Sequence, residues 1–446
     1  MDKQNLTAAE LTKLDQKHFI HPTSSIQEQQ EHGAAIIFKE GNGVYLTDVN
    51  GKTYIEGMAS LWNVNVGYGR KELAKVAQEQ MEALAFSSCF ATFSNEPAIR
   101  LAAKLAELTP GDLQAAFFTS GGSESNDTAY KLVRHYWKVK GQPQKTKIIS
   151  REKGYHGVAV GSTSATGIKD FHHMTSSLAP GFLHVEAFST EALRELIIQE
   201  GADTIAAFIA EPVQGAGGVN IPPDDYFKEV RRICDEHQIL FIADEVITGF
   251  GRTGKWFACE HYGVTPDVML VAKGISSGYS QLGAVIVREF IHQDLIKYSE
   301  GTLLHGFTYS GHPTACAVAL KNIEILEEEQ LIENAEKMGL IFSNHLQQLQ
   351  QECKIVGEIR SLGLIGALEL VKDQETNERF PAKVSPKVIA EARKRGLILR
   401  TVTFGNADTI VFSPPLVINE QEIKEMFDIL KEAIEAVQAQ LFASEK

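Results

Sequence analysis

The sequence predicts an α/β protein with a mostly parallel sheet flanked by helices, together with a smaller α+β domain. Two unbroken apolar runs, residues 239–243 and 268–272, are typical of parallel strands that are buried on both faces. A third observation is a short strand at residues 115–119 that runs into a glycine turn and a helix ending near residue 139. With 446 residues, 43% of them hydrophobic, the chain can bury a large core.

We expect three parts in the chain. Residues 1–65 form an N-terminal segment that completes the small domain, residues 66–328 form the large domain, and residues 329–446 form the C-terminal small domain. The N-terminal segment should contain a helix at residues 8–17 and strands at 35–38 and 43–48, with Asn50-Gly51 as a hairpin turn. Amphipathic or apolar patterns predict helices at 71–85, 96–108, 224–237, 313–328, 331–353 and 385–395, and a strand at 397–400.

The composition excludes several classes of protein. A net charge of −14 argues against nucleic acid or an anionic membrane as a partner. Five cysteines, an odd number without a Cys-x-x-Cys pair, indicate reduced thiols in a cytoplasmic protein. The N-terminus has no apolar stretch typical of a signal peptide, and no run reaches the roughly 20 apolar residues of a membrane span.

Two polar residues end the two buried strands. Lys273 follows the run at 268–272, and Asp244 follows the run at 239–243. A lysine at such an edge can simply extend to solvent, but a buried carboxylate nearby requires a cation. One chemistry needs both groups: a lysine that binds pyridoxal phosphate as a Schiff base, and a carboxylate that keeps the pyridine nitrogen protonated. We therefore predict Lys273 and Asp244 as catalytic residues and no metal site.

The residues around this pair resemble a known family. The stretch from Asp244 to Gly254 (DEVITGFGRTG) is similar to the class III aminotransferases, the ω-transaminase group, and so is the stretch from His305 to Pro313. The resemblance extends over almost the whole chain. It implies fold type I of the pyridoxal-phosphate-dependent transferases, pyridoxal 5'-phosphate as the cofactor, and an N-terminal segment that lies over the mouth of the active site.

A glycine turn before a helix is the predicted phosphate site. Gly121, Gly122 and Ser123 join the strand at 115–119 to the following helix, where free N–H groups and the helix dipole favour an anion. The alternative is an ordinary turn with Ser123 as N-cap. By resemblance, Thr308 reaches the phosphate of the neighbouring subunit in a homodimer with shared sites, and a tetramer stays open.

The resemblance also assigns residues to the cofactor ring. Tyr155 stacks on one face of the pyridine and Val246 covers the other, and Glu211 and His156 complete the cofactor-binding set. His156 can equally be a structural histidine. The family usually has a proline where this chain has Gln281, which leaves the shape of the loop near Lys273 open.

Four residues are predicted to contact substrate together with Tyr155: Phe19, Trp62, Phe90 and Arg400. Phe19 and Trp62 can instead be packing residues, and Arg400 can be a surface arginine that ends a strand. By resemblance, Arg400 is the mobile arginine that binds a carboxylate. Ornithine and 4-aminobutyrate aminotransferases carry another arginine, paired with the glutamate of Glu-Pro, where this chain has Val411.

The predicted reaction is a ping-pong transfer of an amino group from an ω-amino acid or primary amine to a keto acid, with pyruvate as the favoured acceptor. The main alternative is the diaminopelargonate aminotransferase of biotin synthesis, which uses S-adenosylmethionine and typically has two adjacent tryptophans at the position of Trp62. A class III mutase or decarboxylase would use the same lysine and aspartate. A non-catalytic regulator that binds the cofactor would need a DNA-binding segment, and none is visible.

Overall fold

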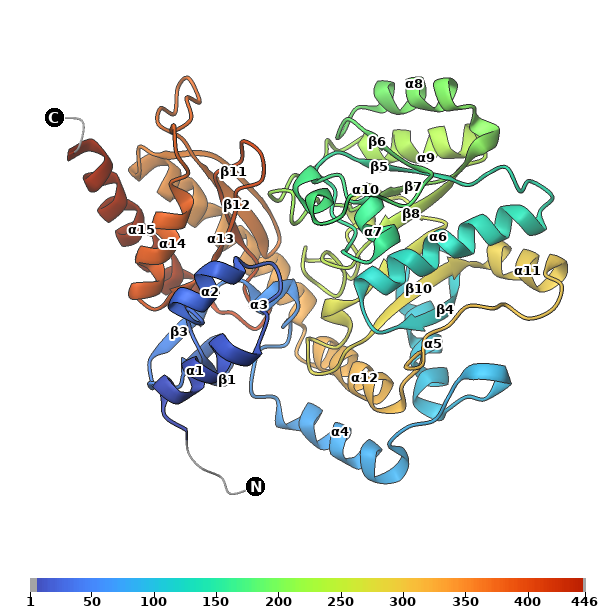
Figure 1. The fold of residues 1–446 in the computed structure, drawn as a ribbon, viewed down its shortest axis with the longest axis horizontal. Helices are drawn as coiled ribbons and strands as arrows, with labels where there is room; N and C mark the ends of the chain where they lie inside the picture. Colours follow the sequence, from blue (N-terminus) through green and yellow to red (C-terminus); the bar gives the residue numbers. More distant parts are fainter. Residues whose placement is uncertain (1–5, 444–446) are drawn as a thin grey trace.

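The chain folds into two parts that lie side by side in Figure 1. The computed structural model describes residues 6–443. One part is built around a seven-stranded sheet, and the smaller part contains two four-stranded sheets with their helices. The smaller part combines residues from both ends of the chain.

The large sheet has the strand order β4-β10-β9-β8-β7-β5-β6. Only β10 runs against its neighbours, so the predicted mostly parallel sheet is confirmed. In β7, β8 and β9 every residue is buried, as the apolar runs predicted. The strands are β4 (Leu113–Thr119), β5 (Lys147–Arg151), β6 (Phe182–Val185), β7 (Ile205–Ala210), β8 (Leu240–Asp244), β9 (Val268–Val271) and β10 (Gly283–Arg288).

Helices cover this sheet and extend from its β4 edge. The predicted bounds of α5 and α12 are confirmed, and both helices begin with local signals: Asn95 accepts a hydrogen bond from the Ala98 N–H at the start of α5, and Pro313 opens α12. The helices are α4 (Lys71–Leu84), α5 (Glu96–Leu108), α6 (Gly122–Val139), α7 (Val160–Ala165), α8 (Thr190–Glu200), α9 (Tyr226–Glu236), α10 (Cys259–Tyr262), α11 (Glu289–Tyr298) and α12 (Pro313–Glu328).

The smaller part contains one sheet of order β1-β2-β3-β13 and another of order β11-β12-β15-β14. Its strands are β1 (Phe38–Asn42), β2 (Tyr45–Asp48), β3 (Thr53–Glu56), β11 (Val356–Leu362), β12 (Ile365–Leu370), β13 (Leu397–Ile398), β14 (Arg400–Val402) and β15 (Thr409–Phe412). Its long helices are α13 (Leu331–Glu352), α14 (Ser385–Lys394) and α15 (Glu420–Ala443). Because β13 pairs with β3, the N-terminal segment and the C-terminal residues share a sheet; the domain boundaries at 65 and 328 stay predictions.

Two predicted strands differ from the structure. The strand expected at 35–38 begins only at Phe38 and continues to Asn42, where it pairs with β2. The strand expected at 397–400 is divided: β13 pairs with β3, while β14 begins at Arg400 and pairs with β15. A single apolar run cannot show that the chain passes from one sheet to another, since the partner of β13 is β3, near the other end of the chain, while β14 pairs with the strand that follows it.

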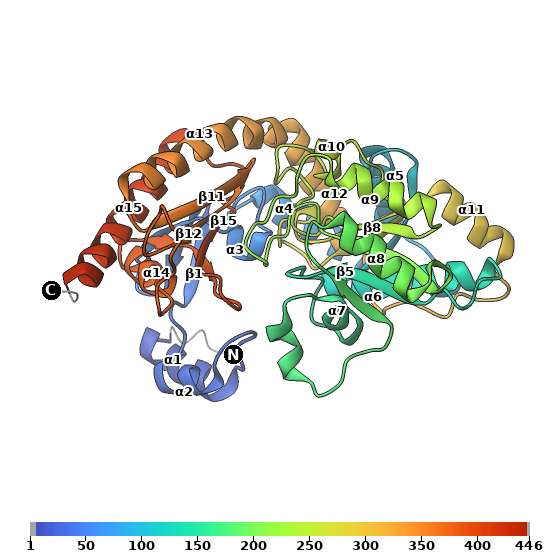
Figure 2. The same ribbon diagram turned by 90° about the horizontal axis from the view of Figure 1, so that it is seen from above.

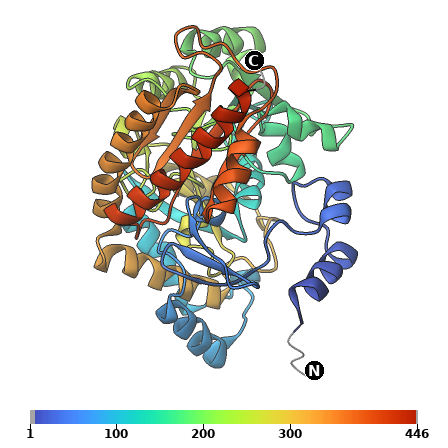
Figure 3. The ribbon, with the colours of Figure 1, turned by 90° about the vertical axis from the view of Figure 1, so that its left-hand side faces the viewer.

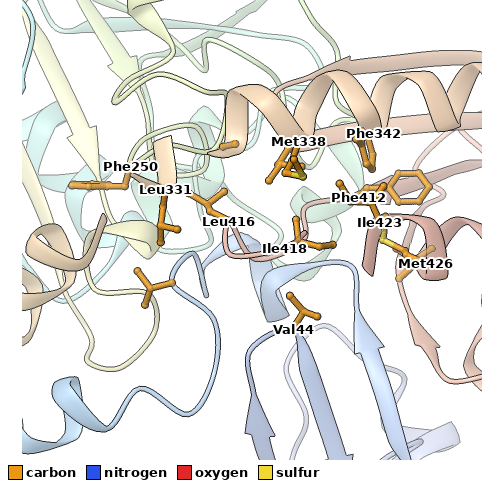
Figure 4. Close-up of a cluster of buried hydrophobic side chains, with 14 of the residues drawn as sticks. Val44, Phe250, Leu331, Met338, Phe342, Phe412, Leu416, Ile418, Ile423 and Met426 are labelled. Atoms are coloured by element: carbon orange, nitrogen blue, oxygen red, sulfur yellow. The ribbon is translucent and has the colours of Figure 1, made fainter. Parts of the chain in front are cut away.

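The N-terminal helices α1 (Ala8–His18) and α2 (Ile26–His32) lie outside the sheets, as Figures 2 and 3 show. A continuous hydrophobic core joins the other elements. In Figure 4, Phe250 from the loop after β8 lies near α13 residues such as Leu331, and Phe412 of β15 packs between α13 and α15. One core that spans both parts fixes their relative position, so residues from both can build a common site.

None of the helices within residues 6–443 is long and apolar enough to cross a membrane. The five cysteines form no disulfide, in agreement with the prediction of reduced thiols.

Candidate active site

Lys273 lies just beyond the end of β9, at the start of a short 3-10 turn, Lys273–Ile275. Its φ of 48° is unusual for a residue with a side chain. Asn322 holds the turn in place, because its Nδ2 donates to the carbonyls of Gly274 (2.9 Å) and Ile275 (3.0 Å). A Cβ on Gly274 would lie 2.6 Å from Asn65 Nδ2, so only glycine fits next to the lysine.

The Lys273 side chain is half-buried, and its charge is disfavoured there. Burial lowers the pKa of the amine to about 8, although the carboxylates of Asp244 and Glu211 oppose this effect. The positive charge of Arg400 adds to the lowering. A sizeable neutral fraction near neutral pH makes Lys273 a competent nucleophile toward a carbonyl carbon.

Asp244 ends β8, the neighbour of β9, so the two predicted catalytic residues lie at the same edge of the sheet. The carboxylate is 3% exposed. Its Oδ2 accepts a hydrogen bond from Asn126 Nδ2 at 3.1 Å and lies 2.8 Å from Nδ1 of His156, while its Oδ1 accepts from the Val246 N–H at 3.2 Å. These contacts orient the carboxylate, which would accept a hydrogen bond from the N–H of a bound ring.

Asn126 is a site residue that sequence reasoning missed. It lies on α6, and Tyr130 donates to its Oδ1 at 2.8 Å, which orients the amide toward Asp244. An asparagine inside a helix is unfavourable unless its side chain has a partner. That was the only signal in the sequence, and it does not name the partner.

His156 follows β5 and is buried against Asp244. The structure therefore places His156 in the site, where it contacts the carboxylate of Asp244. The backbone N–H of His156 donates to Thr166 Oγ1 at 2.9 Å. The ring Nε2 is buried without a hydrogen-bond partner among the described residues.

The predicted phosphate residues lie between β4 and the N-terminus of α6. No side chain caps this 18-residue helix at Gly121, so its first N–H groups are available to an anion. The alternative in which Ser123 is the N-cap is not observed: Ser123 is inside the helix, and its Oγ accepts from the Val158 N–H at 3.1 Å. A Cβ on Gly122 would lie 3.0 Å from Val246 Cγ1, so this loop and the residues after Asp244 touch.

Tyr155 lies half-buried between these groups. Its ring contacts that of Phe171, with centroids 5.2 Å apart. Burial, then the charges of Asp244 and Glu211, raise the pKa of the phenol, and Arg400 lowers it. The structure thus brings Tyr155, Asp244, Lys273 and Arg400 into one electrostatic neighbourhood.

Arg400 begins β14 opposite Val411 on β15. Its side chain is exposed, and its guanidinium makes no hydrogen bond or ion pair within residues 6–443. Val411 is buried in an apolar cluster. The position at which the ornithine and 4-aminobutyrate enzymes have an arginine is therefore filled by a buried hydrophobic side chain in this chain. The carboxylate of Glu211 instead accepts from the N–H groups of Tyr155 (2.9 Å) and Gly215 (3.1 Å).

Trp62 is packed rather than exposed, which supports the packing interpretation. It is 6% exposed and belongs to the same apolar cluster as Val411, with Met58, Val213, Val219, Ile247, Ile365, Ala367 and Val402. Its φ is 63°, and two preceding residues, Ala59 and Ser60, also have positive φ. A direct contact of Trp62 with substrate stays a prediction.

Three other predicted residues are not brought to Lys273 within this chain. Phe19 is 57% exposed; its ring lies 4.5 Å from that of His21, and its carbonyl accepts from Gln29 Nε2 at 2.7 Å. Phe90 and the segment around Thr308 lie together at the β4 edge: a hollow of about 800 Å³ there is lined by Phe90, Phe117, Leu303 and other residues, but not by Lys273 or Asp244. Thr308 is exposed beside it. Their roles stay predictions.

Gln281, in the position of the family proline, is exposed. The loop before it is closed by other contacts: Ser276 Oγ donates to the Ser280 carbonyl at 2.5 Å, and the Tyr279 hydroxyl donates to the Gly67 carbonyl at 2.8 Å. The loop therefore does not depend on a proline.

These features fit pyridoxal 5'-phosphate. An uncapped helix N-terminus suits a phosphate, a buried carboxylate suits a ring N–H, and the amine of Lys273 suits an aldehyde. All three groups extend from the carboxyl-end edge of one sheet.

Comparison with known proteins gives the same result. The chain matches the family aminotransferase class-III over residues 26–434. A putrescine–pyruvate aminotransferase from Pseudomonas aeruginosa is 42% identical over 460 aligned positions, covering 98% of this chain and 99% of that protein.

Solved structures agree in fold. A transaminase from the marine bacterium Virgibacillus has a TM-score of 0.96 and 56% identity, over 97% of this chain and 99% of its own. An omega-transaminase from Pseudomonas jessenii in complex with PMP has a TM-score of 0.93 and 38% identity, over 96% of this chain and 98% of its own. The chain therefore belongs to the class III aminotransferases and has fold type I.

Proposed function

We propose that this protein is a pyridoxal-phosphate-dependent aminotransferase that transfers an amino group from a primary amine or ω-amino acid to pyruvate. The observation that carries the proposal is the Lys273 amine, with its lowered pKa, at the end of β9 next to the aimed carboxylate of Asp244 at the end of β8. The similarity to a putrescine–pyruvate aminotransferase supports the substrate class.

The cofactor would be held at three points. The N-terminus of α6, with Gly121, Gly122 and Ser123, would bind the phosphate, Asp244 would bind the ring N–H, and Lys273 would bind the aldehyde carbon. When bound, pyridoxal phosphate supplies an electron sink that stabilises negative charge on the carbon next to the amino group.

The chain's own residues supply the rest. The negative charge of the buried Asp244 carboxylate, which Asn126 and His156 orient, would favour a positive charge on the bound ring. The Nζ of Lys273 would take a proton from the reacting carbon and return it. Tyr155 and Val246 would flank the bound ring, and the backbone N–H of Tyr155 is held by Glu211.

Arg400 is proposed to bind the carboxylate of pyruvate. It is a free guanidinium whose charge acts on both Lys273 and Tyr155, and Arg–carboxylate pairs can form two parallel hydrogen bonds.

Diaminopelargonate aminotransferase, the alternative from the sequence, is not favoured by the comparisons. A cytoplasmic location stays a prediction.

The test is a panel of half-reactions on the purified protein loaded with pyridoxal phosphate. Putrescine, β-alanine, taurine, 1-phenylethylamine and S-adenosylmethionine are added separately, and the visible absorbance of the cofactor is followed. We expect one or more simple amines to react and pyruvate to reverse the change. Reaction with S-adenosylmethionine alone would overturn the proposal and support the biotin-pathway enzyme.

The same panel tests the role of Arg400. Arg400→Ala should raise KM for pyruvate by about 30-fold or more, because loss of one partner of a charge pair typically costs about 2–5 kcal/mol. The half-reaction with an uncharged amine such as 1-phenylethylamine should change little. Arg379→Ala, at another exposed arginine, which contacts the Asn406 carbonyl and Glu369, is the control. An equal loss in both half-reactions would make Arg400 structural.

We further propose a homodimer in which each active site uses residues of both subunits. The β4 edge exposes large apolar side chains, among them Phe90 (49% exposed), Phe93 and Leu304, around the hollow that holds Phe90. An exposed patch of this kind is typical of a protein–protein interface. Burial of this edge in a dimer would bring Phe90 and Thr308 to the partner's site.

Mixing two inactive variants tests this assembly. Lys273→Ala and Thr308→Glu, which would repel the phosphate, should each be inactive alone. After subunit exchange, a mixed dimer keeps one intact site, so an equal mixture should regain about a quarter of wild-type activity. Lys273→Ala mixed with Asp244→Asn is the control, because these two residues belong to one chain and no intact site can form. Exchange without recovery in the first mixture would contradict shared sites.

A further inference from the structure

The loop that follows β7, residues 212–219, lies between the large sheet and the smaller part of the molecule. On one side, Val213 and Val219 belong to the apolar cluster that contains Ile365 of β12. On the other side, the loop lies directly on the segment before Tyr155, because a Cβ on Gly217 would collide with the carbonyl oxygen of Lys153. A shift of this loop would therefore be felt on both sides.

One arginine of the smaller part holds the loop. Arg360, on β11, donates from Nε and Nη2 to the Gly218 carbonyl (3.3 and 2.8 Å) and from Nε to the Val219 carbonyl (3.2 Å). Its Nη2 also donates to Glu369 Oε1 at 2.8 Å, and its Nη1 lies 3.0 Å from Glu358 Oε2. The side chains of Arg360 and Glu369 are only 12% and 13% exposed, so water and salt screen this pair little.

The first line of contacts from Arg360 leads to Tyr155. The N–H groups of Gly218 and Val219 both donate to the Gly215 carbonyl at 3.1 Å. The Gly215 N–H donates to Glu211 Oε2 at 3.1 Å, and Glu211 Oε1 accepts from the Tyr155 N–H at 2.9 Å. Because each contact is a direct hydrogen bond, the place of the loop fixes the backbone of Tyr155.

The second line leads to the strand that carries Arg400. Glu369 Oε1, which accepts from Arg360, also accepts from Thr409 Oγ1 at 2.9 Å. Thr409 is fully buried on β15, where it pairs with Val402 of β14, and Arg400 begins β14. Burial disfavours the charge of Glu369, but the hydrogen bond and the charge of Arg360 hold the pKa of this carboxyl below its usual range.

A second arginine near Glu369 contributes little. Arg379 is exposed and lies 3.6 Å from Glu369 Oε2, beyond hydrogen-bond distance. Exposed pairs of this kind typically contribute about 0–1 kcal/mol. Among the described residues, Arg360 is thus the side chain that joins the loop to β12 and, through Glu369, to β15.

We propose that Arg360 is a positioning residue that sets the separation of Tyr155 and Arg400, and with it the affinity of the site for a carboxylate bonded directly to the reacting carbon. The inference rests on the proposed function, in which Tyr155 flanks the cofactor ring and Arg400 binds the carboxylate of pyruvate. Arg360 itself touches neither substrate nor cofactor. Pyruvate is short and rigid, so it can reach both places only when their separation is correct.

The experiment compares substrates with and without a carboxylate on the cofactor-loaded protein. Arg360→Lys keeps the charge beside Glu369, but a single ammonium group cannot hold the loop and Glu369 in the planar geometry of a guanidinium. Arg360→Met combined with Glu369→Gln removes both charges, so neither is left buried and unpaired. Both variants should raise KM for pyruvate and L-alanine about tenfold and leave the half-reactions with putrescine and 1-phenylethylamine within about twofold.

Two comparisons separate this role from a general loss of structure. Arg231→Met combined with Asp267→Asn is the matched control, because this pair is similarly sheltered but precedes β9, at the end of the strand opposite Lys273. It should leave the KM for pyruvate unchanged. Thr409→Val, which keeps the side-chain volume and interrupts only the line to β15, should raise the KM for pyruvate about threefold.

Combination with Arg400→Ala tests whether Arg360 acts through Arg400. The variant that carries Arg360→Lys and Arg400→Ala should have the same KM for pyruvate as Arg400→Ala alone, because the residue that is positioned is absent. An additive effect, an unchanged KM for pyruvate in both Arg360 variants, or equal losses with pyruvate and 1-phenylethylamine would overturn the inference. Failure of the proposed function differs, because the cofactor absorbance of the wild-type protein would then respond to no amine.

Discussion

Lys273→Ala should reduce turnover by more than about 10³-fold, since a positioned acid–base group alone contributes about 10²–10⁴ and this lysine also binds the cofactor. The variant should fold normally, because the turn at residues 273–275 is held by backbone contacts and by Asn322. Cofactor should still associate through the N-terminus of α6 and Asp244, but reversibly.

Borohydride reduction of the wild-type protein is the direct measurement. It should attach the cofactor covalently to the peptide that contains Lys273, and no label should appear in Lys273→Ala. Lys255→Ala, at a partly exposed lysine paired with Glu336, serves as the control and should react like wild type. Label on another lysine, or turnover in Lys273→Ala, would show that the assignment is wrong.

Asp244→Asn should have the second largest effect. The substitution keeps the side-chain volume and an oxygen that can accept from Asn126, but removes the negative charge near the ring nitrogen. Loss of a buried charge partner costs about 2–5 kcal/mol, which slows the amine half-reaction by about 30-fold to several thousand-fold at about 1.4 kcal/mol for each factor of ten. Bound cofactor should be retained through its other two contacts.

Stopped-flow absorbance of a single half-reaction measures this loss without product release. Asp267→Asn is the matched control, because Asp267 is equally buried but pairs with Arg231 and Arg288 away from Lys273. It should lower stability and leave the half-reaction rate of the folded protein unchanged. A near-wild-type rate in Asp244→Asn would mean that another carboxylate serves the ring nitrogen.

The sequence by itself determined the strands and the residues at their ends. A strand buried on both faces needs an unbroken apolar run, and such runs at 239–243 and 268–272 located Asp244 and Lys273 without any knowledge of tertiary contacts. Helices α5 and α12 were located for a similar reason, because their caps and prolines are local signals. The glycine turn before α6 was local too, and it lies at the same sheet edge.

Only the tertiary structure decided how side chains from different loops meet. Asn126, His156 and Asp244 come from α6, the loop after β5 and β8, and their contacts depend on the order of strands in the sheet. Trp62 and Val411 share one apolar cluster although they lie more than 300 residues apart, and the strand expected at 397–400 is divided because β13 pairs with β3, more than 300 residues earlier in the chain. Hydrophobic periodicity reports how deeply a residue is buried, but the partner of a buried polar group is chosen by long-range packing, which no local pattern encodes.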